Sequence, residues 1–138
     1  MINQELANIF NEMAILLEMK GVAFKPRAYE RAALTLESLE EDVEDIYKRD
    51  GIKGLDTIPT IGKGMALHIE EFIKKGHFKE YEKLKKEIPV DIRGLRSIEG
   101  IGPTLIKTFY GKLKIRTVAD LEKAARKGKL RVLPRMGE

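Results

Sequence analysis

The chain has 138 residues, with 26 lysines and arginines against 22 aspartates and glutamates, so its formal net charge is +4. Hydrophobic residues make up 43% and charged residues 35%, which predicts one folded domain or two small ones and excludes a disordered segment. Cysteine is absent, which excludes a disulfide scaffold, a thiolate zinc site and a cysteine nucleophile. No apolar stretch approaches the length of a bilayer span and the N-terminus lacks a basic leader, so we expect an intracellular protein without membrane contact.

The charge is unevenly distributed along the chain. The net charge is −5 over residues 1–50, +2 over residues 51–100 and +7 over residues 101–138. A basic surface of this kind can bind a polyanion, because lysines and arginines that neutralise phosphates release condensed counterions. It is also the composition of a solvated helix surface, and charge alone favours that interpretation over polyanion binding.

Apolar residues recur at three- and four-residue spacing along most of the chain, which predicts a succession of amphipathic helices. In chain order, the predicted helices cover residues 3–20, 26–39, 41–50, 63–75, 77–87, 103–110 and 118–127. No segment longer than four residues shows the alternation of a half-buried strand. The predicted fold class is therefore all-α.

Several residues mark the predicted helix ends. Asn3 is a candidate N-cap of the first helix, and Pro26 suits the first turn of the second helix. Gly51 is predicted to end the third helix and to open a loop that runs to Gly54. Thr117, with an acidic residue three positions later, forms a weak capping box before the last helix.

The helical pattern restarts after Pro89 and a predicted turn over residues 91–94. We therefore expect two small helical subdomains, residues 1–87 and residues 88–138, with the segment around Pro89 as the hinge between them.

An internal repeat is the strongest signal in the sequence. Residues 55–64 read LDTIPTIGKG and residues 95–104 read LRSIEGIGPT, so the apolar and glycine positions coincide at an offset of 40 residues. The first copy has Thr60 where the second has Gly100. In each copy an apolar residue precedes a tight turn and an amphipathic helix begins directly after it, which is the pattern of a helix-hairpin-helix element.

Such an element is suited to bind phosphate. Its glycines let the backbone come close to a ligand, and the unpaired N–H groups of the following helix face outward. Contacts of this kind bind the sugar-phosphate backbone without reading base sequence. A single Gly-x-Gly, as in residues 100–102, is more often an ordinary turn, but two copies in register favour the DNA-binding interpretation.

Four segments in this order resemble the N-terminal region of family X DNA polymerases, the relatives of DNA polymerase beta, and their prokaryotic members most. They are PRAYERAA at residues 26–33, IPTIGKG at 58–64, EFIKKG at 71–76 and SIEGIGP at 97–103, and the resemblance covers nearly the whole chain. It implies that the first domain binds the downstream DNA of a gap and that the second binds the primer side. The implied function is recognition of gapped or nicked DNA in repair synthesis, base excision repair included.

The resemblance also implies which residues bind. Lys25 and Tyr29 match positions that line the pocket for the 5′-phosphate at the gap, although a helix-start lysine and a core tyrosine are an equally good reading of the two residues. The DNA-binding residues implied are Lys25, Tyr29, Thr60, Gly62, Lys63, Gly64, His68, Gly100, Gly102, Thr104 and Lys107. The backbone carbonyls of Ile58, Ile61, Ile98 and Ile101 match the family's sites for a monovalent cation, K⁺ or Na⁺.

The sequence departs from the family at the residues that would carry catalysis. The family's Schiff-base lysine is His68 here, and imidazole cannot form that imine; a second family lysine is Gly64, and a basic loop position is Asp56. No carboxylate set for nucleotidyl transfer can be assembled from these helices. We expect a fragment with no catalytic residue, from a parent polymerase with a Mg²⁺-dependent palm domain and in some relatives a phosphoesterase domain. Residues 133–138 resemble the opening of a further helix.

Three functions remain to be compared. The first is the gap-recognising part of a polymerase, a monomer in the cytoplasm among nucleoid DNA, with DNA and the rest of the polymerase chain as partners. The second is a stand-alone helix-hairpin-helix adaptor whose acidic first half recruits a protein. The third is an abasic-site lyase that uses an unexpected amine. A sequence-specific regulator is disfavoured, since residues 118–127 offer no asparagine or glutamine to read adenine.

Overall fold

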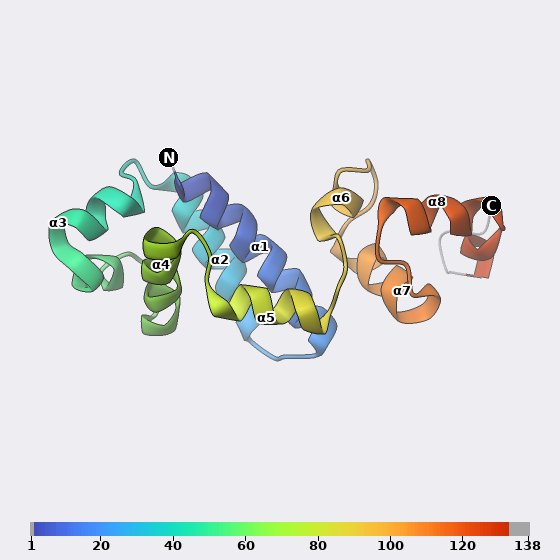
Figure 1. The fold of residues 1–138 in the computed structure, drawn as a ribbon, viewed down its shortest axis with the longest axis horizontal. Coiled ribbons are helices and arrows are strands. Elements are labelled where there is room, and N and C mark those ends of the chain that lie inside the picture. The colour runs from blue at the N-terminus through green and yellow to red at the C-terminus, as the bar shows by residue number, and fades with distance from the viewer. Residues whose placement is uncertain (1, 133–138) are drawn as a thin grey trace. The chain divides into compact units, whose positions relative to one another are not determined.

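The computed structural model describes residues 2–132, and within this range every regular element is a helix (Figure 1). The elements are α1 (Ile2–Lys20), α2 (Lys25–Ser38), α3 (Val43–Asp56), α4 (Lys63–Lys75), α5 (Lys79–Glu87), α6 (Ile92–Arg96), α7 (Pro103–Leu113), α8 (Val118–Arg126) and the 3-10 helix η1 (Lys129–Val132). The all-α prediction is confirmed. The expectation for residues 133–138 lies outside the described residues. None of the helices described is long and apolar enough to cross a membrane.

The chain divides into two compact units, Met1–Ile88 and Pro89–Glu138. The first unit holds α1 to α5 and the second holds α6 to η1. Each unit contains one copy of the sequence repeat.

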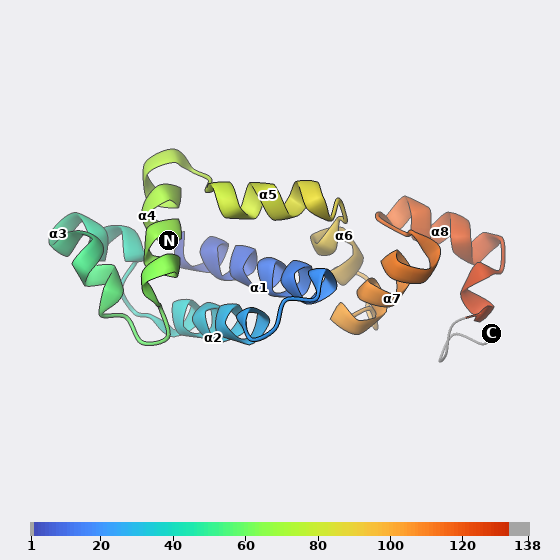
Figure 2. The same cartoon turned by 90° about the horizontal axis from the view of Figure 1, so that it is seen from below.

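The first unit is built around α1. This helix lies between α2 and α5, and its most extensive contact is with α2 (Figure 2). It buries large apolar side chains along its length, with Leu6, Phe10, Met13 and Leu16 fully buried. The buried side of α2 has two alanines, Ala32 and Ala33, between Tyr29 and Leu36, and these small residues allow the two helices to approach closely. The remaining pair, α3 and α4, packs together at the end of the unit where α1 begins (Figures 1 and 2).

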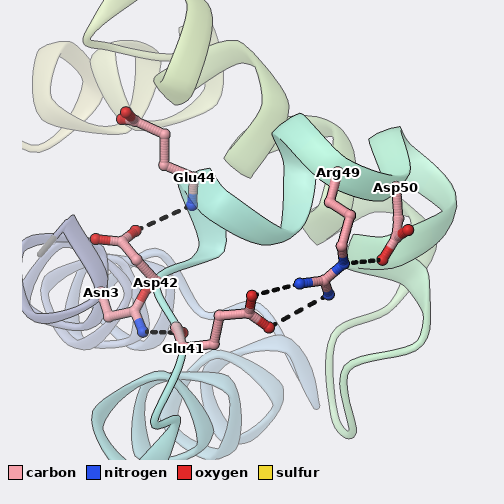
Figure 3. Close-up of polar contacts among 6 residues, drawn as sticks. All are labelled: Asn3, Glu41, Asp42, Glu44, Arg49 and Asp50. Carbon is pink, nitrogen blue, oxygen red and sulfur yellow. Dashed lines mark hydrogen bonds and ion pairs between the residues drawn. The ribbon is translucent and has the colours of Figure 1, made fainter.

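Asn3 is not the N-cap of its own helix, so that prediction is wrong. It lies inside α1 and is 3% exposed. Its side-chain oxygen accepts a hydrogen bond from the Val43 N–H at 2.8 Å. Its amide nitrogen donates to the Glu41 carbonyl at 2.9 Å (Figure 3). Asn3 thus satisfies the first turn of α3, 40 residues away. No local pattern could have indicated this partner.

Asp42 completes the junction between α1 and α3. Its carboxylate accepts a hydrogen bond from the Ile2 N–H at 3.0 Å. It also accepts the Glu44 N–H at 3.0 Å (Figure 3). One side chain therefore caps the beginnings of two helices. On the exposed side, Arg49 bridges Glu41 and Asp50 (Figure 3). These contacts fix α3, which leads into the first hairpin, on the end of α1.

The predicted loop between Gly51 and Gly54 is also wrong. Gly51 does end a first helical segment, as predicted, with φ 68° and ψ −158°, but a second short helix follows at once and brings α3 to Asp56, so no loop forms. The turn predicted over residues 91–94 is likewise the start of a five-residue helix, α6. Both short helices are anchored by a fully buried leucine, Leu55 or Leu95, so tertiary packing stabilises turns of helix that are too short to form alone.

The other predicted helices are observed, and all except α4 have one or both ends shifted. The range of α4 is as predicted, and Gly76 ends it in the left-handed conformation. The first residue of α5 is Lys79 rather than His77, because the Glu71 carboxylate accepts the Lys79 N–H at 2.9 Å. The Thr117 hydroxyl accepts the Asp120 N–H at 3.1 Å, as the capping pattern predicts.

Candidate nucleic-acid interface

The two hairpins have the same construction, bond by bond. In each, a hydroxyl at the end of the short helix donates to a glycine carbonyl three residues earlier, from Thr57 to Gly54 at 2.7 Å and from Ser97 to Gly94 at 2.6 Å. The N–H of the next isoleucine then bonds the leucine carbonyl, at 3.2 Å in both copies. The structural repeat therefore includes the short helices 52–56 and 92–96. It begins three residues earlier in each copy than the sequence repeat, which starts at residues 55 and 95.

The tips of the hairpins also match. The Ile61 N–H bonds the Ile58 carbonyl at 3.2 Å, and the equivalent bond in the second copy is 3.1 Å. Gly100 has φ 86°, and Thr60 takes the same left-handed conformation with φ 66°, although a side chain makes it costly there. The Thr60 hydroxyl is bonded to the Thr35 hydroxyl at 2.7 Å, which holds this turn against α2. The change from glycine to threonine therefore leaves the turn intact.

The glycines of each hairpin have two distinct roles. A Cβ added at Gly54 would lie 2.7 Å from the Asp50 Cβ, so this glycine is required by packing. A Cβ at Gly62, Gly64 or Gly102 would meet no atom within 4 Å. These three positions therefore present bare backbone to the surroundings, where a ligand can approach the N–H groups.

The predicted contact regions coincide with a particular type of helix start. Among the α-helices described, only α2, α4 and α7 have neither a side-chain cap nor an acidic residue in the first turn. Lys25 begins α2, Gly62 precedes α4 and Gly102 precedes α7. At α4 and α7 the first N–H groups and the positive end of the helix dipole are not neutralised by the protein, which makes each of these starts a site for an anion. At α2 the Lys25 N–H bonds the Ala23 carbonyl at 2.8 Å and Pro26 has no N–H, so this start attracts an anion chiefly through its helix dipole.

Around the start of α2, the structure brings together Lys25, Tyr29 and His68. The Tyr29 ring is buried and packs edge-on against Phe10, with 5.1 Å between ring centroids. The His68 ring is half-buried and stacks on Phe78 at 5.0 Å, and Phe78 in turn contacts Phe10 at 6.3 Å. A continuous aromatic cluster thus holds the tyrosine of α2 and the histidine of α4, and Lys25 lies exposed near His68.

Burial and the nearby charges keep the side chains of Tyr29 and His68 neutral. Burial, assisted by the Glu80 carboxylate, raises the pKa of Tyr29 to about 12. Its hydroxyl forms no hydrogen bond within the described residues, and because no fully buried polar side-chain atom there is unpaired, the hydroxyl reaches the surface as a free donor. Burial also lowers the pKa of His68, and Lys25 adds to this, while Glu80 and Glu71 oppose it. This group of residues therefore combines the Lys25 cation with two neutral hydrogen-bonding side chains, and the Glu80 and Glu71 carboxylates lie close enough to act on them.

The histidine should make stability depend on pH. The folded state lowers the pKa of His68, so below about pH 6.5 the unfolded chain binds the proton more readily, and the free energy of unfolding falls as the pH falls. We expect urea titrations between pH 7.5 and pH 5.5 to show a smaller loss of stability for His68→Gln than for the unchanged chain. His77→Gln, at an exposed histidine, is the matched control and should keep the original pH dependence. Equal slopes for the two variants would contradict this account.

The remaining predicted contact residues lie at or after the hairpins. Thr60, Lys63 and Gly64 are exposed at the first hairpin, and Thr104 and Lys107 are exposed on α7 of the second. Each unit therefore carries its own group of candidate residues. Sequence reasoning missed Phe78 and Glu80, the residues that support and polarise the pocket, because no motif marks them and they reach it only through the packing of α5 against α1.

The hairpin carbonyls are suitable ligands for a monovalent cation. Ile58 and Ile98 each accept one N–H within the turn, which leaves a second lone pair on each oxygen. Among the described residues, no group of three histidines or acidic residues could hold a metal ion. Any cation at these turns would therefore be held by neutral backbone oxygens.

Two family models match the chain, a helix-hairpin-helix domain over residues 1–78 and a SAM-like helix-hairpin-helix tandem over residues 92–138. The chain thus belongs to the helix-hairpin-helix domain family, and this supports DNA binding. It is also similar to the N-terminal part of the DNA polymerase/3′-5′ exonuclease PolX of Bacillus subtilis (strain 168), with 28% identity over 136 residues. The match covers 98% of this chain but 23% of the relative's length. The resemblance to family X polymerases is therefore confirmed.

Proposed function

We propose that this chain binds gapped DNA without reading its sequence and recognises the 5′-phosphate at the gap, as the DNA-recognition part of a family X polymerase that fills gaps in repair. The observation that carries the proposal is the coincidence of the three candidate contact regions with the three uncapped, acid-free helix starts, α2, α4 and α7. A phosphate oxygen is the ligand that such helix starts accept.

The hairpins and the start of α2 would bind different parts of the DNA. The hairpins before α4 and α7 offer backbone N–H groups beside glycines with open space, and this arrangement suits an unbroken sugar-phosphate backbone. The pocket at the start of α2 adds a lysine charge and the free hydroxyl donor of Tyr29. A terminal phosphate carries more charge than a phosphodiester and has more oxygens free to accept hydrogen bonds, so this pocket would favour a strand end.

The proposal also covers the cations at the hairpins and the activities of a longer protein. We propose that K⁺ or Na⁺ binds at the carbonyls of Ile58 and Ile61, and of Ile98 and Ile101, where it would bridge protein and phosphate. Because the chain spans 23% of its relative's length, polymerisation with Mg²⁺ in a palm domain, and any phosphoesterase activity, would belong to other parts of a longer protein. The chain would act as a monomer in the cytoplasm on nucleoid DNA.

A comparison of one-nucleotide-gapped duplexes with and without the 5′-phosphate tests the proposal. We expect the phosphate to strengthen binding about tenfold or more, because a hydrogen bond to a charged group contributes about 1.5–3 kcal/mol. Lys25→Ala should remove most of this preference, and Tyr29→Phe part of it, since phenylalanine keeps the packing on Phe10. Arg27→Ala is the matched control, an exposed cation two residues from Lys25 on α2.

The outcomes separate the alternatives. A preference that survives Lys25→Ala, or that Arg27→Ala removes equally, would place 5′-phosphate recognition elsewhere. Equal binding of gapped and intact duplexes with one salt dependence would leave the hairpins as general backbone clamps and favour the adaptor function.

A further inference from the structure

A second basic surface lies in the Pro89–Glu138 unit and is formed by residues outside the hairpin. A groove of about 250 Å³ is lined by the end of α7, the segment that connects it to α8, α8 itself and the residues that follow it. Its charged lining consists of five cations and one carboxylate: Lys114, Arg116, Lys123, Lys127, Lys129 and Asp120. We refer to it as the α7–α8 groove.

The charges in the α7–α8 groove are not balanced by the protein. All five cations are exposed, and none forms an ion pair with another residue in the described part of the chain. Asp120 is already occupied, because its carboxylate accepts the Arg116 backbone N–H at 3.1 Å. Arg126, on the same helix but outside the groove, is by contrast paired with Glu122. Five like charges around one groove repel one another, and a bound anion would relieve that repulsion.

The backbone conformation of Lys114, which lines the groove, is also energetically unfavourable. Lys114 ends α7 in the left-handed conformation, with φ 53°, and its N–H bonds the Tyr110 carbonyl at 3.0 Å. Glycine is the usual residue at such a position, since a side chain is strained there. The sequence thus places a cation where the fold favours glycine, beside a groove already rich in positive charge.

We propose that the α7–α8 groove binds the sugar-phosphate backbone of DNA as a phosphate site additional to the hairpins. The proposal rests on the DNA binding proposed above. Lys123 and Lys127 are one helical turn apart, and Lys114 and Arg116 continue the row on the connecting segment, so the cations are spread along the groove. The rest of the lining is aliphatic and offers nothing that would orient a base or a small ligand. A row of exposed cations fits a row of phosphates.

The test compares two charge-matched double variants on an intact duplex over a series of salt concentrations. Lys123→Gln with Lys127→Gln removes two groove charges, and Lys112→Gln with Arg126→Gln removes two exposed charges from the same two helices outside the groove. We expect the slope of log affinity against log salt to fall by about two in the groove variant and to change much less in the control. Equal slopes for the two variants would overturn the proposal.

Lys114→Gly separates binding from folding. It relieves the strained conformation while it removes a groove charge, so we expect a higher melting temperature together with weaker DNA binding and a slope reduced by about one. Unchanged DNA affinity of the Lys114→Gly variant would contradict DNA binding by the α7–α8 groove.

Titration with inorganic pyrophosphate distinguishes a strand from a free anion. One result would overturn the proposal by making the groove a small-anion site. In that result the unchanged chain binds pyrophosphate stoichiometrically, and the Lys123→Gln, Lys127→Gln variant loses this binding but keeps the same slope of log DNA affinity against log salt. An intact duplex has no gap, so failure of 5′-phosphate recognition does not affect this test. Absence of any DNA binding by the unchanged chain would instead overturn both proposals.

Discussion

Phe10→Ala is expected to destabilise the first unit by about 3–5 kcal/mol, a large part of the stability of a domain of this size. Phe10 is fully buried, and its ring contacts Tyr29 from α2 and Phe78 from the segment before α5. Alanine would leave a cavity at the point where three parts of the unit meet. Urea unfolding followed by circular dichroism measures the change. The same cavity removes the support of Tyr29, so the 5′-phosphate preference proposed above should also be weaker in this variant where it remains folded.

Phe24→Ala is the matched control for this substitution. Phe24 is 91% exposed, so its removal should change the free energy of unfolding by no more than about 0.5 kcal/mol. Comparable losses in the two variants would show that the aromatic cluster around Phe10 does not hold the unit together.

Asn3→Ala is expected to cost about 2–3 kcal/mol, because it leaves a buried Val43 N–H without an acceptor and removes the donor to the Glu41 carbonyl. The loss should be localised. Amide hydrogen exchange of Val43 and of the first turn of α3 should accelerate more than that of α5, which Asn3 does not contact.

Asn8→Ala provides the control on the same helix. Asn8 is exposed and its hydrogen bond is to Gln4 one turn earlier, so this variant should stay within about 0.5 kcal/mol of the unchanged chain. If Asn3→Ala proves equally mild, the junction of α1 with α3 is maintained without its side chain.

The sequence predicted the elements whose signals are local. Periodic apolar residues marked α1 and α2, and the glycine after Lys75 marked the end of α4, because amphipathic spacing and left-handed caps act within a few residues. The candidate hairpins were found for the same reason. Their turns are closed by hydrogen bonds between residues three apart, so the repeat is visible as a repeated string.

The predictions that failed depend on distant partners. Asn3 and Asp42 each satisfy helix ends across about 40 residues, and the short helices before the hairpins exist because Leu55 and Leu95 are buried by other elements. Gly51 breaks the helix as predicted, but packing maintains a second short helix directly after it, where a loop was predicted. Local propensity is a weak term, and tertiary burial outweighs it for segments of one or two turns.

The same division holds for the candidate sites. The sequence by itself determined the all-α fold and the two hairpins, and its resemblance to family X polymerases made Lys25 and Tyr29 candidates for phosphate binding. Only the tertiary structure decided that Phe10 and Phe78 join Tyr29 to His68, that Glu80 acts on both rings, and that α2, α4 and α7 begin without a cap. The physical reason is that capping, burial and electrostatic coupling depend on distances in space, which a string of residues does not contain until the helices have packed.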